Sequence, residues 1–148
     1  MQTKIVHSYG IIPVRKTDTG LELLLINMYG SAGGTHWTFP KGRPEAGETP
    51  LASALRECVE EVGLVPTHVY SDTPILEHYT FMYQGEQIDK TVTFFVGVIE
   101  NSIVTIQPEE IKEALWVPLA QVSDRLTYPA AQSVLAQAAA LFIKVGLS

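Results

Sequence analysis

Residues 42–64 read GRPEAGETPLASALRECVEEVGL, and this stretch decides the fold. Its first seven residues contain two glycines, a proline and several charges, which favours a loop. Thr49 and Pro50 follow with a side-chain acceptor for an N-cap and a proline for the first helical position. Gly63 lies where a C-terminal glycine cap is expected. The stretch therefore predicts a helix over 49–62 that follows a densely charged loop.

The predicted helix has an apolar face and an acidic face. At about 100° per residue, four apolar side chains fall within roughly 60° of one another and predict the core-facing stripe. Three glutamates at i, i+3 and i+4 span roughly 100° on the far side. The apolar residues are Leu51, Leu55, Cys58 and Val62, and the acidic residues are Glu57, Glu60 and Glu61.

Three carboxylates at this spacing repel one another, and they lie at the negative end of the helix dipole. Arg56 can offset one of them by pairing with Glu60 at i+4, but it cannot neutralise all three. Two interpretations follow. The acids form an ordinary solvated helix face, or they bind a divalent cation, for which hard oxygen ligands favour Mg²⁺ or Mn²⁺.

The rest of the chain predicts strands and one more helix. The order of strands, helix, strands and helix lacks a regular βαβ alternation, so we expect an α/β fold in which helices cover a mixed sheet. A flexible loop is predicted at Ser31–Gly34 from its small residues. Strands are predicted at 4–14, 21–28, 37–39, 73–83, 90–99 and 114–117, with a turn around 85–86 and a helix at 130–145.

Composition bounds the class of protein. The 148 residues are 46% hydrophobic and fit one domain, 1–148. Ten basic and sixteen acidic residues give a net charge of −6, which argues against binding extended nucleic acid. The apolar runs are strand-sized, and the N-terminus lacks signal-peptide features, so no membrane segment is expected. Cys58 is the single cysteine, which favours a reducing, cytoplasmic setting. We expect a monomer.

The spacing within residues 42–64 resembles the Nudix box, G-x5-E-x7-R-E-U-x-E-E-x-G-U, where U is an apolar residue. Every fixed position is present, with Cys58 at the first U. Seven fixed identities at these distances recur by chance on the order of once in 10⁹ start positions, which favours the metal interpretation. The resemblance implies an α/β/α sandwich around a mixed sheet. It also implies a Mg²⁺-dependent hydrolase, with Mn²⁺ as a substitute, acting on a nucleoside diphosphate linked to another group.

The resemblance also implies roles for the acidic residues. The metal would be held by Glu57, Glu60 and Glu61, with the carbonyl of Gly42 as a further ligand. Glu110, in an acidic loop before the strand that contains Trp116, is similar to a loop acid of relatives. It would contribute to the metal site, and the alternative is an ordinary solvated loop acid.

Two further box residues and the general base follow from the same resemblance. Glu48 and Arg56 resemble the pair that ties the loop to the helix. Water would attack phosphorus while a carboxylate takes its proton. Glu60 is the first candidate for this base within the box, and Glu110 is the candidate outside it.

The segment before the box, HWTFPKG at 36–42, is similar to that of asymmetric diadenosine tetraphosphate hydrolases within the family. Lys90, which begins a predicted strand with Thr91 and Val92, also fits that group. Relatives use lysines in these two positions to hold polyphosphate, which predicts phosphate contacts from Lys41 and Lys90. His36 would either donate to a phosphate or pack beside Trp37.

An adenine base needs a flat aromatic partner. Tyr79, Phe81 and Tyr83 alternate along one predicted strand and share one of its faces. Tyr128 begins the last predicted helix, where relatives place an aromatic residue. Tyr79, Tyr83 and Tyr128 are the candidates for stacking, and the alternative for each is ordinary core packing.

The sequence therefore predicts asymmetric cleavage of diadenosine tetraphosphate, a small-molecule substrate, to ATP and AMP. The alternative within the family is removal of pyrophosphate from the 5′ end of RNA, or hydrolysis of another nucleoside diphosphate derivative. A nucleotide sensor without catalysis is a third possibility, which the intact box disfavours.

Overall fold

The computed structural model describes residues 2–30 and 33–148, and these contain eight strands and three helices. Ser31 and Ala32 of the predicted loop lie outside the described residues. The strands are β1 (Thr3–Thr17), β2 (Gly20–Tyr29), β3 (Thr35–Thr38), β4 (Lys41–Gly42), β5 (His68–Val69), β6 (Ile75–Tyr83), β7 (Glu86–Val98) and β8 (Ile111–Pro118). The helices are α1 (Pro50–Val62), α2 (Leu119–Arg125) and α3 (Pro129–Val145).

The strands form one mixed sheet. Its main path runs β3-β2-β1-β7-β5, while β4 pairs with β1, β6 with β7 and β8 with β2. The long central pair, β1 and β7, is parallel, and the other pairs are antiparallel. The prediction of a mixed sheet is confirmed.

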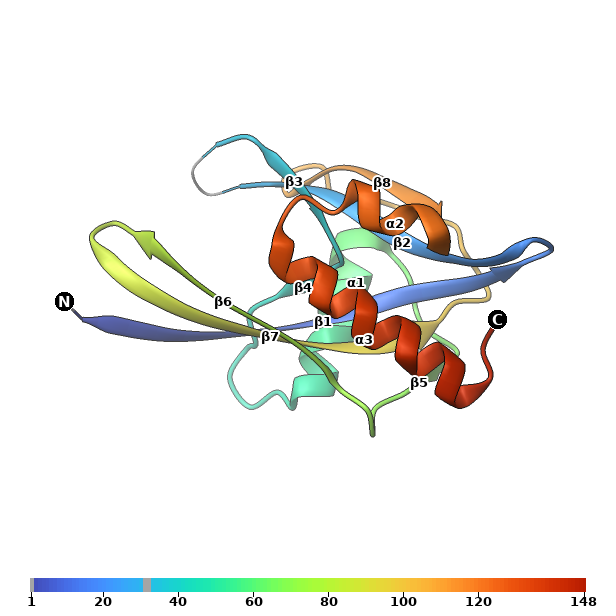
Figure 1. Ribbon diagram of the computed structural model, residues 1–148. Coiled ribbons are helices and arrows are strands. Elements are labelled where there is room, and N and C mark those ends of the chain that lie inside the picture. The colour runs from blue at the N-terminus through green and yellow to red at the C-terminus, as the bar shows by residue number, and fades with distance from the viewer. Residues whose placement is uncertain (1, 31–32) are drawn as a thin grey trace.

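Helices cover both faces of this sheet. In Figure 1, α3 crosses in front of the sheet and α1 lies behind it. The buried residues accordingly form two clusters, and the neighbours Ile11 and Ile12 on β1 belong to different ones. Side chains that alternate between faces produce this division. One cluster includes Cys58 and Val62 of α1, and the other includes Val134 of α3. The expected α/β/α sandwich is confirmed.

Strands β6 and β7 form a long hairpin that projects beyond the helices together with the start of β1 (Figure 1). Gln84 and Gly85 at its tip have φ angles of 49° and 78°, as a tight hairpin turn of the mirror-image type requires. The outer edge of β6 meets α3, where the Gln137 amide bonds the backbone N–H (3.1 Å) and C=O (2.8 Å) of Leu76. One side chain thus takes the place of a neighbouring strand at that point.

Several elements differ from the predicted ones. β1 runs to Thr17 and β8 begins at Ile111, so both exceed their predicted lengths, because pairing with β2 extends them. The two-residue strands β4 and β5 depend only on pairing with β1 and β7. α2 was not predicted, and its N-cap residue Pro118 makes no capping hydrogen bond through its side chain.

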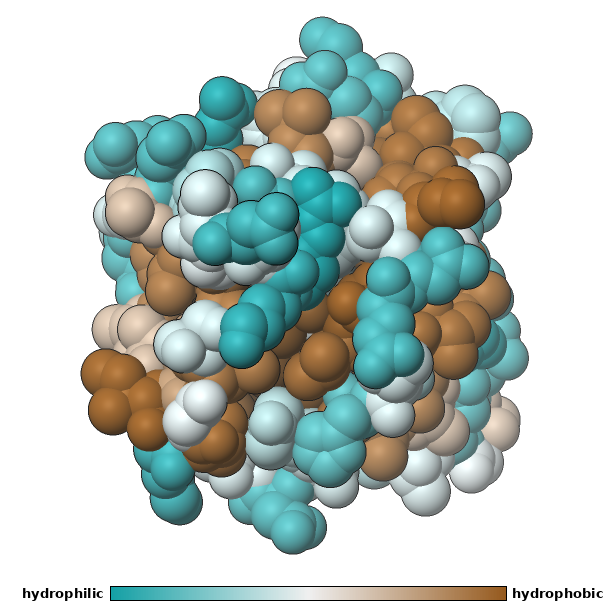
Figure 2. Space-filling model, turned by 90° about the vertical axis from the view of Figure 1, so that its right-hand side faces the viewer, coloured by the Kyte–Doolittle hydropathy of each residue, from teal (hydrophilic) through white to brown (hydrophobic). Residues whose placement is uncertain are grey.

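The side of the molecule opposite to the hairpin carries hydrophobic patches separated by hydrophilic side chains (Figure 2). Such a mixture is ordinary for a protein surface. Within residues 2–30 and 33–148, none of the helices has both the length and the apolar character needed to cross a membrane.

Candidate active site

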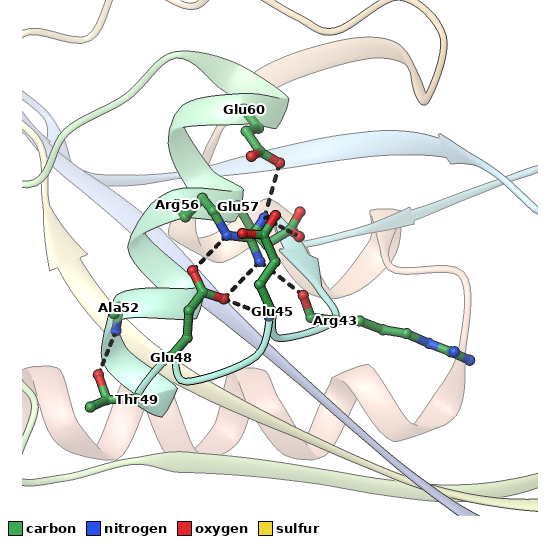
Figure 3. A network of polar contacts seen from close by, with 8 residues as sticks. All are labelled: Arg43, Glu45, Glu48, Thr49, Ala52, Arg56, Glu57 and Glu60. Carbon is green, nitrogen blue, oxygen red and sulfur yellow. Dashed lines mark hydrogen bonds and ion pairs between the residues drawn. The ribbon is translucent and has the colours of Figure 1, made fainter.

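The charged loop before α1 is tied to the helix by one arginine (Figure 3). Arg56 donates from Nε to Glu48 (2.7 Å), from Nη2 to the other Glu48 oxygen (3.0 Å) and from Nη2 to the carbonyl of Arg43 (2.9 Å). The Arg56 guanidinium, assisted by the backbone N–H of Glu45, lowers the pKa of Glu48 to about 2. The Glu48–Arg56 pair is therefore in contact, as the box resemblance implies, and it fixes the loop geometry.

The helix itself has the predicted ends. The Thr49 hydroxyl accepts from the N–H of Ala52 (3.1 Å), and Gly63 adopts a left-handed φ of 71°. These caps fix the helical phase, which in turn sets where each glutamate points.

The same guanidinium contacts two more glutamates. Arg56 Nη1 lies 3.0 Å from Glu57 and 3.1 Å from Glu60, which includes the predicted i,i+4 pair. The hydrogen bonds that Arg56 donates to Glu48, and then to Glu57 and Glu60, raise the pKa of Arg56. The acidic cluster remains short of positive charge.

Glu61 corrects the prediction that all three glutamates lie away from the core. Its residue is only 1% exposed, because it follows Ala54 by seven residues and lies about 20° from it around the helix. Its Oε1 accepts from the backbone N–H of Lys41 (2.9 Å). Burial, together with the charges of Glu57 and Glu110, raises the pKa of Glu61 to about 8. The buried face of α1 consists of Ser53, Ala54, Cys58, Glu61 and Val62.

Gly42 and Glu57 are packed directly against each other. A Cβ atom at Gly42 would overlap with all three atoms of the Glu57 carboxyl group. Burial raises the pKa of Glu57, as do Glu60 and Glu110, while Arg56 opposes the shift. This position therefore requires glycine, and the backbone of β4 lies close to the acidic face.

Glu110 is brought to the same place by backbone hydrogen bonds at the end of α1. The N–H of Gln107 donates to the carbonyl of Glu61 (3.0 Å), and the N–H of Tyr29 donates to the carbonyl of Glu110 (3.1 Å). The charge of Glu110 consequently acts on the pKa values of both Glu57 and Glu61. The loop acid singled out by sequence is part of the acidic group.

These donors fit a hard divalent cation but do not form a ready cage. In the described part of the chain, no three His, Cys, Asp or Glu side chains converge as metal ligands, and Glu57 and Glu60 turn toward Arg56. Three observations favour a cation: all donors are oxygens, the buried Glu61 carboxylate forms no ion pair within the described residues, and Gly42 leaves room for the Glu57 carboxylate.

A pocket of about 910 Å³ opens beside the acidic group. Ten of the thirteen residues selected from the sequence line it. The two box residues Glu48 and Arg56 do not line it, but Arg56 contacts the lining residues Glu57 and Glu60. Tyr83, which the sequence offered as a stacking residue, does not line the pocket, because it lies near the hairpin tip, where it is 42% exposed. The ten are His36, Lys41, Gly42, Glu57, Glu60, Glu61, Tyr79, Lys90, Glu110 and Tyr128.

The wall formed by the hairpin and β4 is basic. Burial lowers the pKa of Lys90 to about 8, and the nearby charges of Lys41 and Arg43 add to this shift. His36 likewise has a lowered pKa because of burial and the same two lysines, Lys41 and Lys90. Glu77, which sequence reasoning missed, lines the pocket beside them and is 4% exposed. Its one signal in the sequence is a position two residues before Tyr79 on the same strand face.

Aromatic rings lie at two places around the pocket. The rings of Tyr79 and Phe81 stack at 5.8 Å, which agrees with their predicted common face. The rings of His36 and Tyr128 lie 5.2 Å apart, and Tyr128 is the residue before the first turn of α3. Flat groups can therefore stack at either place.

A mixed sheet between helices, with a glycine-led loop and an acidic helix at its pocket, defines a Nudix-type protein. The model of the NUDIX domain family matches residues 6–138, and the chain belongs to this family. Nudix hydrolases generally use divalent metal ions such as Mg²⁺.

Two relatives are about a third identical to this chain over the residues that align. The mutator protein MutT4 of Mycobacterium tuberculosis is 31% identical over 104 residues, which are 70% of this chain and 41% of that protein. The mouse bis(5′-nucleosyl)-tetraphosphatase [asymmetrical] is 32% identical over 118 residues, which are 78% of this chain and 76% of that protein. The chain thus spans less than half of the first relative.

One short match and one solved structure extend the comparison. An RNA pyrophosphohydrolase of a Psychrobacter species is 54% identical over 37 residues, a quarter (25%) of this chain and 21% of that protein. The crystal structure of a Caenorhabditis elegans Ap4A hydrolase in a binary complex has a TM-score of 0.75 at 22% identity, covering 94% of this chain and 98% of that one. The structural likeness shows the shared fold.

Proposed function

We propose that this chain is a Mg²⁺-dependent hydrolase of dinucleoside polyphosphates that cleaves diadenosine tetraphosphate to ATP and AMP. The observation that carries the proposal is the division of one pocket into an acidic wall and a basic, aromatic wall. A polyphosphate needs cations along its length and flat partners for its bases. The similarity to the mouse tetraphosphatase supports this substrate class.

The acidic residues would hold the cation. Glu57, Glu60 and Glu61, with the carbonyl of Gly42 and with Glu110, supply the oxygen ligands that Mg²⁺ prefers, and Mn²⁺ would substitute. Bound there, the ion would neutralise charge on phosphate oxygens and lower the pKa of a bound water.

The other residues bind and orient the substrate. Lys41 and Lys90 would contact phosphate oxygens, with His36 beside them, while Tyr79 and Tyr128 stack on adenine. These contacts would place one phosphorus beside the acidic wall, so that positioning contributes to the rate.

The proton of the attacking water needs an acceptor. The oxygen of the water forms the new bond to phosphorus, and the bridging P–O bond breaks. Glu60 or Glu110 would take the proton of the water. The products are ATP and AMP in equal amounts. Glu60 is paired with Arg56 (3.1 Å), whereas Glu110 lines the pocket on a loop held by backbone hydrogen bonds.

The test is hydrolysis of diadenosine tetraphosphate by the purified protein with Mg²⁺ in ¹⁸O-labelled water. We expect equal amounts of ATP and AMP by chromatography, with the label in one product. ADP as sole product, or no turnover, would reject the proposal. The same panel tests metal dependence, because chelation with EDTA should abolish turnover and added Mg²⁺ or Mn²⁺ should restore it.

A second candidate is removal of pyrophosphate from the 5′ end of RNA, favoured by the short match to an RNA pyrophosphohydrolase. The net charge of −6 weakens binding of long RNA, but a short 5′ end can enter the pocket. Comparing kcat/KM for triphosphorylated RNA with that for the dinucleotide separates the two functions. A higher value for the RNA would make it the principal substrate.

A further inference from the structure

Glu77 is a buried carboxylate that the proposed hydrolysis does not use. It lies on β6, lines the pocket and is 4% exposed. In the described part of the chain its Oε1 takes no hydrogen bond, and the nearest cation is Lys41, whose Nζ lies 3.6 Å away. A buried carboxylate oxygen without a hydrogen bond is costly, so a role in the pocket is the simplest explanation for the presence of Glu77.

Glu77 and Tyr79 hold Lys41 together. Both residues belong to the same face of β6, because they are two positions apart. The Lys41 ammonium is 3.6 Å from the carboxylate and 5.7 Å from the centre of the Tyr79 ring, and its side chain is 10% exposed. The ammonium therefore rests between a charge and a ring face, both of which attract a cation.

Lys90 lies close to the same group. Lys90 is the cross-strand partner of Tyr79, and Glu77 pairs with Val92 two residues further along the same strands. Lys90 and Glu77 therefore lie diagonally opposite each other on one face of the sheet. The charges of Lys41, Arg43 and Glu77 act on Lys90, and the charges of Lys41 and Lys90 act on His36, so four charged or titratable groups surround Lys90: His36, Lys41, Arg43 and Glu77. Glu77 is the only anion among these four.

We propose that Glu77 is a positioning residue whose carboxylate holds the Lys41 ammonium against Tyr79 and supplies the negative charge that lies diagonally opposite Lys90 at the basic wall. The inference rests on the proposed function, because it assigns the two lysines to phosphate. Nearby cations and burial disfavour the charged form of Lys90, and a carboxylate on the same sheet face reduces the cost of keeping Lys90 charged.

The sign of the effect follows from the charges around Lys90. Burial, Lys41 and Arg43 lower the pKa of Lys90 to about 8, and Glu77 opposes them. Removing the Glu77 charge therefore lowers this pKa further, by about one pH unit for a neighbouring ion. In the variant, Lys90 then loses its proton at a lower pH than in the wild type. The site consequently loses its affinity for phosphate at that lower pH as well.

The experiment compares wild type, Glu77→Gln and Glu86→Gln. Glu86 lies on the same hairpin and is exposed, so its variant loses the same charge away from the pocket. The titration of Lys90 is followed through its ε-¹³C resonance, assigned by its absence in Lys90→Arg. Binding of inorganic tripolyphosphate without metal is measured by calorimetry at pH 6.5 and pH 8.5.

We expect the Lys90 midpoint to fall by about one pH unit in Glu77→Gln and to stay unchanged in Glu86→Gln. The dissociation constant for tripolyphosphate in Glu77→Gln, relative to wild type, should rise by up to about tenfold between the two pH values. An unchanged midpoint in Glu77→Gln, or an ordinary midpoint above about pH 10 in wild type, overturns the inference.

Two features keep the result interpretable. If Glu77→Gln does not fold, Glu77→Asp retains the charge at a longer distance and should give an intermediate midpoint, whereas a wild-type midpoint in it overturns the inference. Neither readout uses turnover. If the Lys90 midpoint differs between wild type and Glu77→Gln as expected, but the wild type does not hydrolyse the dinucleotide, only the proposed function is refuted.

Discussion

Replacing Glu61 by Gln should change how the stability of the metal-free protein depends on pH. Glu61 is buried, and its pKa is raised from 4.5 to about 8 by burial and by Glu57 and Glu110. Between these two values the folded protein keeps a proton that the unfolded chain releases. The free energy of unfolding therefore falls as pH rises through this range. The glutamine variant lacks this titration.

The size of the effect follows from the two pKa values. A difference of one between the folded and unfolded pKa corresponds to about 1.4 kcal/mol, so between pH 5 and pH 8 the wild type should lose about 3 to 4 kcal/mol relative to Glu61→Gln. The amide oxygen of glutamine can still accept from the backbone N–H of Lys41, which leaves local structure intact. Other titrating groups are common to both proteins and cancel in the comparison.

Urea denaturation in EDTA at pH 5, 6, 7 and 8 measures this difference. Mg²⁺ at about 100 times its dissociation constant should then restore about 2.7 kcal/mol to the wild type at pH 8, and less at pH 5, because binding requires the ionised carboxylate. The variant should show little restoration and should have lost hydrolysis. Parallel stability curves for the two proteins in EDTA would refute the reasoning about Glu61.

Three further predictions follow from the contacts around the pocket. Gly42→Ala should lower kcat about 100-fold in steady-state assays with near wild-type thermal stability, because its Cβ displaces the Glu57 carboxylate; an unchanged kcat would contradict the packing. Arg56→Met should lower the midpoint of urea denaturation, because Glu48 loses a two-point pair that ties the loop to the helix, and an unchanged midpoint would count against this role. Tyr128→Ala should raise KM for the dinucleotide about tenfold with little change in kcat, as loss of a base-stacking partner requires; a lowered kcat at unchanged KM would exclude stacking.

The most predictable element was α1, because its signals are local. Thr49 caps its first turn, and Gly63 ends it in the left-handed conformation that glycine favours. The family resemblance assigned Glu57 and Gly42 to one metal site, and the two residues are packed against each other. By contrast, β4 and β5 exist only through pairing with distant strands, and no local pattern in two residues reveals that.

The parts of the site that sequence reasoning missed depend on which surface another element covers. The predicted direction of each side chain around α1 was correct. However, β1 and the loop after Ile99 cover more of the helix surface than the apolar stripe, and Glu61 lies in the additional covered part. Glu77 alternates correctly with Tyr79, yet alternation does not tell which face of a strand lines a pocket. Tyr83 shares that alternation but does not line the pocket, because its strand extends beyond the pocket.

The hairpin of β6 and β7 has a consequence for how new specificities could arise. The glutamates proposed for hydrolysis lie on α1 and on the loop before β8, whereas Tyr79, Phe81 and Lys90 lie on the β6–β7 hairpin. Mutations that lengthen, shorten or replace the hairpin's outer half would leave the acidic helix and its caps untouched. If the proposed function holds, evolution, or a protein engineer grafting hairpins between relatives, could therefore change which nucleotide is bound while keeping the acidic helix that would carry out cleavage.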